Sequence, residues 1–142
     1  MPTQRANWTC SACALAWVLR ATGLDDGANE DQCVEQIGYP GNINSTYGLM
    51  DGSGAQLRRV LAEYDQDSSQ GWLGFSDAYA VAGRTTGMMS GGGWYHWVAL
   101  RGHDGGNIWV ANSAPGYRGV WESLSREEFQ RLGPFSVVWL EA

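Results

Sequence analysis

The chain has no lysine, and all nine of its basic residues are arginine. Fifteen acidic residues give the 142-residue chain a formal net charge of −6, and the arginines form no basic stripe. This composition argues against nucleic acid as a partner. The chain also lacks an apolar run of membrane-spanning length, and its first residues lack the apolar core of a signal peptide. We therefore expect no membrane span, and either synthesis in the cytoplasm or a domain cut from a longer protein.

Cysteines are few as well. The three present match no zinc-binding spacing, because too few further ligands accompany them, and their odd number leaves at least one without a disulfide partner. We expect neither a metal nor another cofactor. A length of 142 residues, with 44% hydrophobic and 17% charged residues, suits one globular domain. We take this domain to be residues 1–142 and to be a monomer.

Helical patterns dominate the first half of the chain, and strand patterns dominate the second half. The order predicts an α+β fold in which helices precede a small antiparallel sheet. Capping boxes are expected at Ser53–Gln56 and Ser125–Glu128, and Thr9 or Ser11 is expected to cap the first helix. The first expected helix starts at Cys10 and is closed by Gly23, and the other expected helices are 29–37, 53–64, 76–82 and 125–132. The expected strands are 72–75, 85–89, 94–101, 108–112, 117–121 and 135–140.

The most informative stretch is residues 4–20, where Cys10 stands at the start of a strongly apolar helix. Unpaired backbone N–H groups and the positive end of the helix dipole favour the thiolate there, and the thiolate is the nucleophilic form of cysteine. Gln4 stands where its side-chain amide can fold back and donate to an oxyanion. The alternative for Cys10 is a buried structural cysteine.

Two histidines are available as a base for this thiol. His103 lies in a polar turn that explains it without catalysis. His96 lies in the apolar run 94–100, where it needs a partner, either the thiol or a polar group within the core. Asn112, at the end of the next strand, can hold the His96 ring in one tautomer, although by itself it fits an ordinary strand-ending turn better.

The order Gln4, Cys10, His96 and Asn112, together with the runs 10–16 and 96–100, resembles the papain-like cysteine peptidases. They are most similar to the compact bacterial branch that includes the leader peptidases of bacteriocins, which cut after a double glycine. The resemblance covers most of the chain and implies a papain-like fold, with the nucleophile at the start of a buried central helix. It also implies Cys10 as nucleophile, His96 as general base and acid, Asn112 as the residue that orients His96, and Gln4 as oxyanion donor.

Two departures from that pattern concern the nucleophile. Ser11-Ala12 stands where Gly-Pro is usual, and Cys13 adds a second thiol. Cys13 lies deeper in the helix, where burial makes a thiol inert, so Cys10 is the preferred nucleophile.

A second resemblance concerns the substrate. Residues 7–13 and 17–23 resemble the N-terminal peptidase domains of endolysins from phages of actinobacteria. This resemblance implies hydrolysis of the peptide part of bacterial peptidoglycan, with the protein acting on the cell wall after release. The alternatives are a leader-peptide-processing peptidase and a deamidase or acyltransferase with the same triad.

Eight tryptophans also permit a different class of function, a module that binds cell-wall glycans. Such a module has no use for a cysteine, a histidine and an asparagine in this order. We instead interpret Trp8 and Trp94, which lie near the candidate catalytic residues, as walls of a substrate cleft. The glycine-rich loop 41–54, which contains Tyr47, is either another wall or a plain surface connection.

Overall fold

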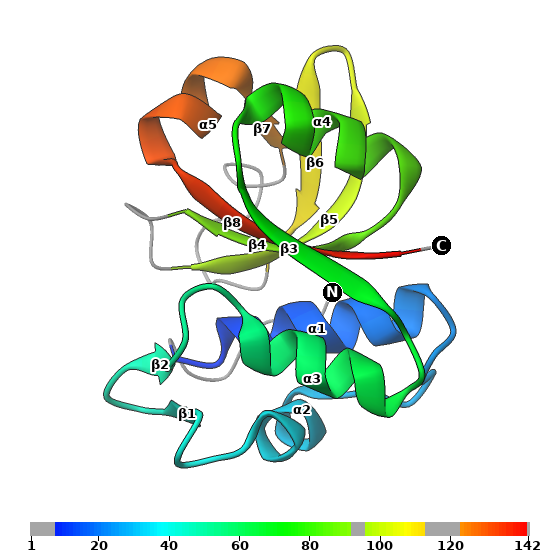
Figure 1. The fold of residues 1–142 in the computed structure, drawn as a ribbon, viewed down its shortest axis with the longest axis vertical. Helices are drawn as coiled ribbons and strands as arrows, with labels where there is room; N and C mark the ends of the chain where they lie inside the picture. The colour runs from blue at the N-terminus through cyan, green and yellow to red at the C-terminus, as the bar shows by residue number, and fades with distance from the viewer. Residues whose placement is uncertain (1–7, 92–95, 113–122, 142) are drawn as a thin grey trace.

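A computed structural model describes residues 8–91, 96–112 and 123–141 of the chain. The first part of the chain forms a helical layer, shown at the bottom of Figure 1. Its elements are the helices α1 (Cys10–Ala21), α2 (Glu30–Ile37) and α3 (Ala55–Glu63), and a short hairpin of β1 (Ile43–Asn44) and β2 (Gly48–Leu49). Local signals define α2, because Asn29 accepts a hydrogen bond from the Gln32 N–H and Gly38 ends the helix with a positive φ of 114°.

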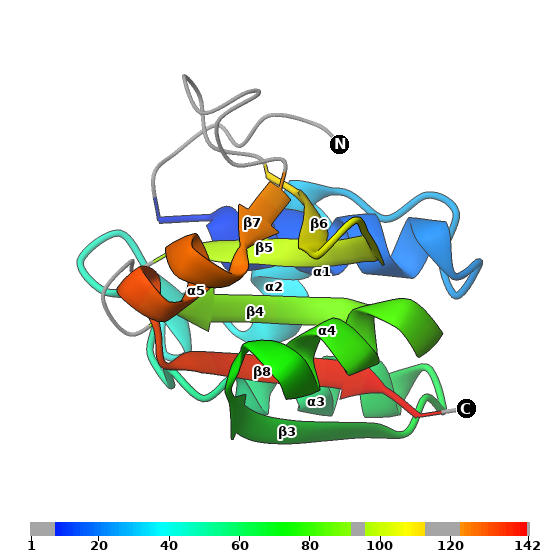
Figure 2. The same ribbon diagram turned by 90° about the horizontal axis from the view of Figure 1, so that it is seen from above.

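The second part of the chain forms an antiparallel sheet of six strands in the order β3-β8-β4-β5-β6-β7. Its strands are β3 (Ser68–Leu73), β4 (Gly87–Gly91), β5 (Trp97–Asp104), β6 (Asn107–Ala111), β7 (Ser123–Ser125) and β8 (Phe135–Leu140). Two further helices, α4 (Phe75–Arg84) and α5 (Arg126–Leu132), cover the face opposite the first helical layer (Figure 2). The fold is therefore a sheet between two layers of helices.

Both faces of the central strands are buried, which explains their continuous apolar sequence. Met88 of β4 and Val138 of β8 belong to the core beneath α1, whereas their neighbours Met89 and Val137 belong to the core beneath α4 and α5. The alternation follows from the two-residue period of a strand. Helix α1 is buried almost all round, as its apolar sequence predicts, and it packs against β4 and β5.

The second predicted capping box is confirmed, because Ser125 and Glu128 exchange both hydrogen bonds at the start of α5. The first is wrong. Helix α3 begins after Gly54, whose φ is +92°, and Ser53 donates to Asp51 instead of capping the helix. A Cβ at position 54 would lie 2.7 Å from the Val138 side chain and 2.9 Å from the Trp97 ring, so packing as well as φ selects glycine there.

Other boundaries differ in smaller ways. Thr9 is the N-cap residue of α1 but makes no capping side-chain hydrogen bond, and Ser11 lies within the helix, so the expected side-chain cap is wrong. Strand β3 begins at Ser68, before the expected strand 72–75, and it lies at the edge of the sheet, where polar residues are acceptable because one side faces solvent. Helix α4 begins at Phe75 and continues past Gly83 to Arg84. The strand expected at 117–121 lies outside the described residues.

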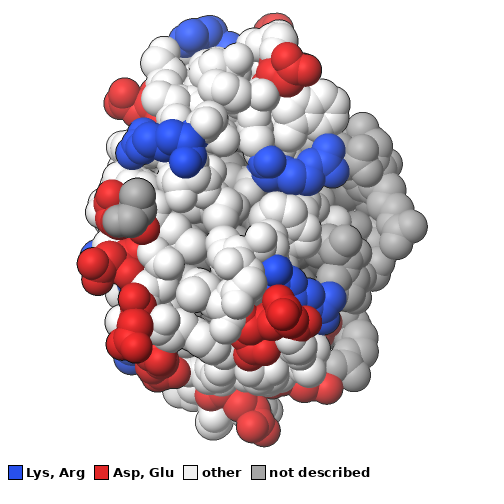
Figure 3. All heavy atoms as spheres, turned by 90° about the vertical axis from the view of Figure 1, so that its right-hand side faces the viewer, with Lys and Arg blue, Asp and Glu red and all other residues white. Residues whose placement is uncertain are grey.

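In the part of the chain that the structure describes, no helix combines the length and apolar character needed to cross a membrane. Figure 3 shows the face on the right-hand side of Figure 1, where arginine and acidic side chains are interspersed. The basic side chains on this face form no continuous area.

Candidate active site

Cys10 is the first residue of α1, directly beneath the sheet. The backbone N–H of Trp97, the first residue of β5, donates to the Cys10 Sγ across 3.4 Å. Cys10 is 7% exposed, so the residue is largely enclosed by protein, and it lines a cavity that opens to solvent. The sulfur is thus held between the start of a buried helix, which carries it, and a central strand, which donates a hydrogen bond to it.

His96 immediately precedes Trp97, so the strand that contacts the thiol also supplies the histidine. The His96 Nε2 and the Asn112 Oδ1 lie 2.7 Å apart, and Asn112 directly follows β6. Because an amide oxygen only accepts, this contact assigns the proton to Nε2 and leaves Nδ1 as the basic nitrogen. The expectation that hairpin geometry brings Asn112 to the His96 ring is confirmed.

Burial shifts the pKa of both Cys10 and His96. It raises the pKa of Cys10 above its ordinary value, although the backbone N–H groups of Trp97, Ser11 and Cys10 itself lower it. It also lowers the pKa of His96, against the opposing hydrogen bond to Asn112. Both shifts favour the neutral thiol and the neutral imidazole, because loss of hydration is the largest effect on each group. They oppose the thiolate that we expect at the helix start, and the resting protonation of the pair stays a prediction.

A cavity of about 260 Å³ opens beside the thiol, and half of its wall comes from the hairpin β1–β2 and its turn. The lining residues are Trp8, Cys10, Ser45, Thr46, Tyr47, Gly48, Leu49, Gly52, Ser90 and Trp97. Tyr47 is 72% exposed, so its ring stands at the rim of the cavity. The loop 41–54 is therefore a wall of the cavity and not a plain connection.

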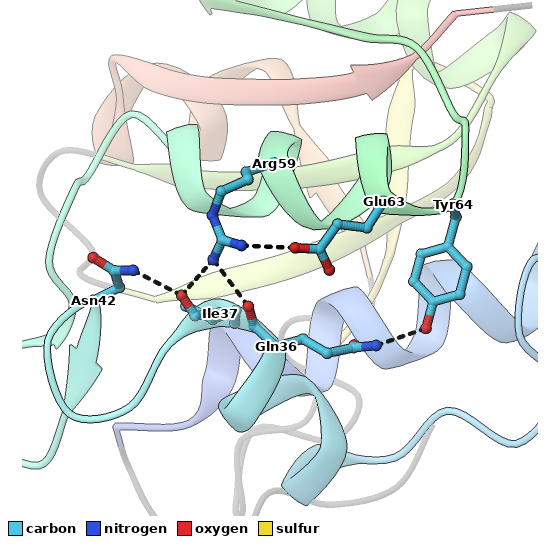
Figure 4. Close-up of polar contacts among 6 residues, drawn as sticks. All are labelled: Gln36, Ile37, Asn42, Arg59, Glu63 and Tyr64. Atoms are coloured by element: carbon cyan, nitrogen blue, oxygen red, sulfur yellow. Dashed lines mark hydrogen bonds and ion pairs between the residues drawn. The ribbon is translucent and has the colours of Figure 1, made fainter.

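The hairpin is anchored through the end of α2, as Figure 4 shows. The guanidinium of Arg59, on α3, donates to the carbonyl oxygens of Gln36 and Ile37 at 2.9 and 2.7 Å. The Asn42 side chain, one residue before β1, donates to the same Ile37 carbonyl at 2.9 Å. These contacts tie the last turn of α2 to both α3 and the base of the cavity wall.

The predicted substrate-binding residues have different outcomes. Trp8 and Tyr47 both line the cavity beside Cys10. Gln4 and Trp94 lie outside the described residues, so their assigned roles stay predictions. Of the lining residues that sequence reasoning missed, Ser90 on β4 pairs in register with Trp97 and enters the wall through that pairing. The contribution of Trp97 to the thiol is made by its backbone, which no residue type signals.

The other candidates for catalysis lie elsewhere. Cys13 is fully buried, and its Sγ lies 3.3 Å from the Glu30 Oε2. The His103 Nδ1 lies 3.0 Å from the Tyr79 carbonyl oxygen, on α4 across the sheet from α1. Among the described residues, no group of three or more histidine, cysteine or carboxylate side chains is arranged to hold a metal ion.

A cysteine at the start of a buried helix, packed on an antiparallel sheet that supplies a histidine and an asparagine, defines the papain-like class of fold. The solved structures similar to this chain belong to that class. One is a double-glycine-motif protease from an AMS/PCAT transporter in complex with the leader peptide, which is 17% identical, with a TM-score of 0.73 over 99% of this chain and 89% of that one.

Two further solved structures have a similar fold. The peptidase domain of Streptococcus ComA, a bifunctional ABC transporter involved in a quorum-sensing pathway, is 12% identical, with a TM-score of 0.72 over 98% of this chain and 95% of that one. A C39-like peptidase from Bacillus anthracis is 12% identical, with a TM-score of 0.68 over 100% and 94%. No family model matches the sequence, and neither does any curated protein.

The predicted papain-like α+β fold is thus confirmed, and so is its likeness to the double-glycine peptidase branch. The predicted link to phage endolysins and peptidoglycan is not supported by these similarities and stays a prediction.

Proposed function

We propose that the chain is a cysteine peptidase that cleaves polypeptides through Cys10, His96 and Asn112, with a substrate of the leader-peptide type. The observation on which the proposal depends is the contact of the Trp97 N–H with the Cys10 sulfur, next to a histidine held by an amide oxygen. The likeness in fold to a double-glycine protease solved with its leader peptide supports the substrate class.

The reaction is acyl transfer through the sulfur of Cys10. As Sγ attacks the scissile carbonyl carbon, its proton passes to the Nδ1 of His96, which later gives it to the leaving amine. The backbone N–H of Cys10, at the helix start, donates to the oxyanion, and Gln4 is the second donor proposed. Water then attacks the thioester, with His96 as base, and releases the acid. Because both pKa shifts favour the neutral forms, we expect proton transfer to accompany the attack instead of preceding it.

The hairpin wall explains how a polypeptide is held. The cavity beside Cys10 is about 260 Å³, too small for a folded partner but sufficient for a few residues of an extended chain. Exposed aromatic rings at Tyr47 and Tyr39 lie near its mouth, because Tyr39 stacks on Trp8 with ring centroids 5.7 Å apart. A substrate segment with apolar side chains on either side of the cut therefore fits this surface best.

The test uses two substrates in parallel, a library of synthetic peptides that contain a Gly-Gly pair and purified peptidoglycan. We expect cleavage of library members at one defined bond, read by mass spectrometry. Cys10→Ala should abolish the cleavage, and Asn112→Ala should lower kcat by about 100-fold with little change in KM, because the imidazole loses its fixed tautomer. His103→Gln, a histidine change outside the site, should leave both constants unchanged.

Other results would replace the proposal. Release of soluble peptides from peptidoglycan, without cleavage of the library, would favour the endolysin-type function. A gain of about 1 Da without chain cleavage would identify a deamidase, and attachment of an added amine would identify an acyltransferase. Cleavage that survives in Cys10→Ala would contradict the assignment of the nucleophile.

A further inference from the structure

Cys10 and Cys13 stand one turn apart at the start of α1, in the sequence Cys-Ser-Ala-Cys. The Cys13 N–H donates to the Thr9 carbonyl at 3.1 Å, so this turn is regular. Residues at this spacing share one side of a helix, with Cα atoms about 5 Å apart, which is within the range that a disulfide spans. None of the three cysteines, all of which lie in the described residues, is in a disulfide in this structure.

The two thiols differ in access. Cys10 lines the cavity and is 7% exposed, whereas Cys13 is 0% exposed and lies within the protein. A small oxidant that enters the cavity therefore meets Cys10 first. Cys13 is placed to react only with a group that is already inside the protein.

Cys13 also has a base beside it. Its Sγ lies 3.3 Å from the Oε2 of Glu30, a carboxyl in the first turn of α2 that is only 8% exposed. A buried carboxylate that accepts the thiol proton allows Cys13 to act as a thiolate at the moment of attack. Nothing in the proposed peptidase reaction uses either Cys13 or Glu30.

We propose that Cys10 and Cys13 form a reversible oxidation site, at which a peroxide switches the peptidase off; the switching rests on the proposed function of Cys10 as nucleophile. Peroxide oxidises the Cys10 thiol to a sulfenic acid and is itself reduced to water. The Cys13 sulfur then attacks the Cys10 sulfur, its proton passes through Glu30 to the departing hydroxide, and a second water leaves as the S–S bond forms.

The position at the helix end makes the bond attainable. The N–H groups of the helix residues before Cys13 have no partners within the helix, so the first turn can tighten without loss of a helical hydrogen bond from those groups. The disulfide would then occupy the sulfur required for attack. A dithiol reductant reverses the reaction by exchange and restores both thiols.

Cys33 supplies an internal control. It lies on α2 and is 0% exposed, and burial raises its pKa to about 12. Cys33 is not among the residues that line the cavity beside Cys10. We therefore expect Cys33 to stay reduced under conditions that oxidise Cys10 and Cys13.

The experiment treats the whole chain with hydrogen peroxide, blocks remaining thiols with N-ethylmaleimide and digests with trypsin. Arg5 and Arg20 flank one peptide, residues 6–20, that contains both cysteines. We expect this peptide to lose about 2 Da and to escape the blocking reagent. Dithiothreitol should restore its mass, as well as the peptide cleavage measured with the library substrate.

Three variants sharpen the result. Cys33→Ala should behave as the wild type. Cys13→Ser keeps a hydroxyl donor for Glu30 but cannot form the bond, so Cys10 should gain about 32 or 48 Da as sulfinic or sulfonic acid and activity should not return. Glu30→Gln should slow disulfide formation by about tenfold or more without changing the final product, because the base is lost and the shape is kept.

The outcomes separate the two proposals. Absence of the 2-Da loss in the wild type, or equal recovery of activity in Cys13→Ser, overturns the oxidation site whatever the chain cleaves. Formation of the disulfide in a protein that cleaves neither library peptides nor peptidoglycan supports the oxidation site and counts only against the proposed peptidase.

Discussion

At the scale of single residues, the Cys10 environment combines two opposed effects. Three backbone N–H groups stabilise the thiolate, but burial removes water from the same sulfur and raises its pKa. Two opposed effects act on His96 as well, because burial lowers its pKa and the hydrogen bond to Asn112 raises it. On both residues the effect of burial favours the neutral form, thiol and imidazole, before substrate binds.

The pH dependence of alkylation tests this resting state. Because the Cys10 pKa lies above its ordinary value, we expect the rate of reaction with iodoacetamide to rise with pH through the neutral range, by about tenfold per unit, without a plateau near pH 6. Cys10 should nevertheless react before Cys13 and Cys33, since both of those are 0% exposed. Peptide mapping of the labelled protein at a series of pH values measures all three rates.

A plateau in the Cys10 rate at mildly acidic pH, lost in His96→Ala, would contradict the neutral pair. It would establish a resting thiolate–imidazolium pair instead. Cys33 is the reference within each sample, because burial holds its pKa at about 12.

At the scale of elements, the fold places the candidate site through three junctions. These are the start of α1, the start of β5 and the end of β6. The cavity wall depends on a fourth junction, where α2 ends against α3. Arg59 contributes there twice, through hydrogen bonds to the carbonyls of Gln36 and Ile37 and through its positive charge at the C-terminal end of α2.

Removal of the Arg59 guanidinium should therefore lower the free energy of unfolding by more than removal of its surface ion pair with Glu63. We expect Arg59→Met to lower the free energy of unfolding by about 1 kcal/mol, because two carbonyl oxygens lose a charged donor. Glu63→Gln, which removes only the exposed 2.8 Å ion pair with Arg59, should cost less than about 0.5 kcal/mol. Urea unfolding of the two variants and the wild type measures both values, and equal costs would contradict the carbonyl contacts as the main contribution.

Elements with strong local signals were predictable from the sequence. Asn29 and Gly38 define α2, and Ser125 with Glu128 defines the start of α5. Strand β3 was largely missed because its first residues are polar, and only its position at the sheet edge makes them suitable for a strand. Gly54 was missed as the start of α3 because the reason for glycine there lies in distant contacts with Val138 and Trp97.

The candidate site shows the same division. Cys10, His96 and Asn112 were predictable because the chemistry depends on their side chains, and their order along the chain resembles a known pattern. The Trp97 N–H, the Ser90 pairing and the burial that reverses the expected pKa of Cys10 were not, since each depends on the backbone or on tertiary packing.

At the scale of the whole molecule, burial of the site is a consequence of the layered fold. The sheet is covered on both faces, and His96, at the entry to a central strand, is only 8% exposed. The folded state therefore opposes protonation of that ring, which links the protonation of His96 to the stability of the whole fold.

The sign of this linkage follows from the lowered pKa of His96. The unfolded chain binds the proton at a higher pH than the folded chain, so the stabilisation is present above the unfolded value of about 6.5. It is lost as the pH falls from that value through the folded pKa. The carboxyl groups of Asp25 and Asp51 are held below their ordinary pKa by hydrogen bonds, from Gln32 and from Ser53 respectively, and their contribution is lost only at lower pH.

Between about pH 7.5 and pH 5 we therefore expect the free energy of unfolding to decrease, with His96 as a main cause. His96→Gln removes the titrating ring and should reduce this decrease. Urea unfolding of the wild type and this variant at several pH values within the window gives the two curves. Parallel curves for the wild type and His96→Gln would mean that the ring is protonated as readily in the folded protein as in the unfolded chain. The neutral resting pair, and the mechanism in which the proton moves only as the sulfur attacks, would then have to be abandoned.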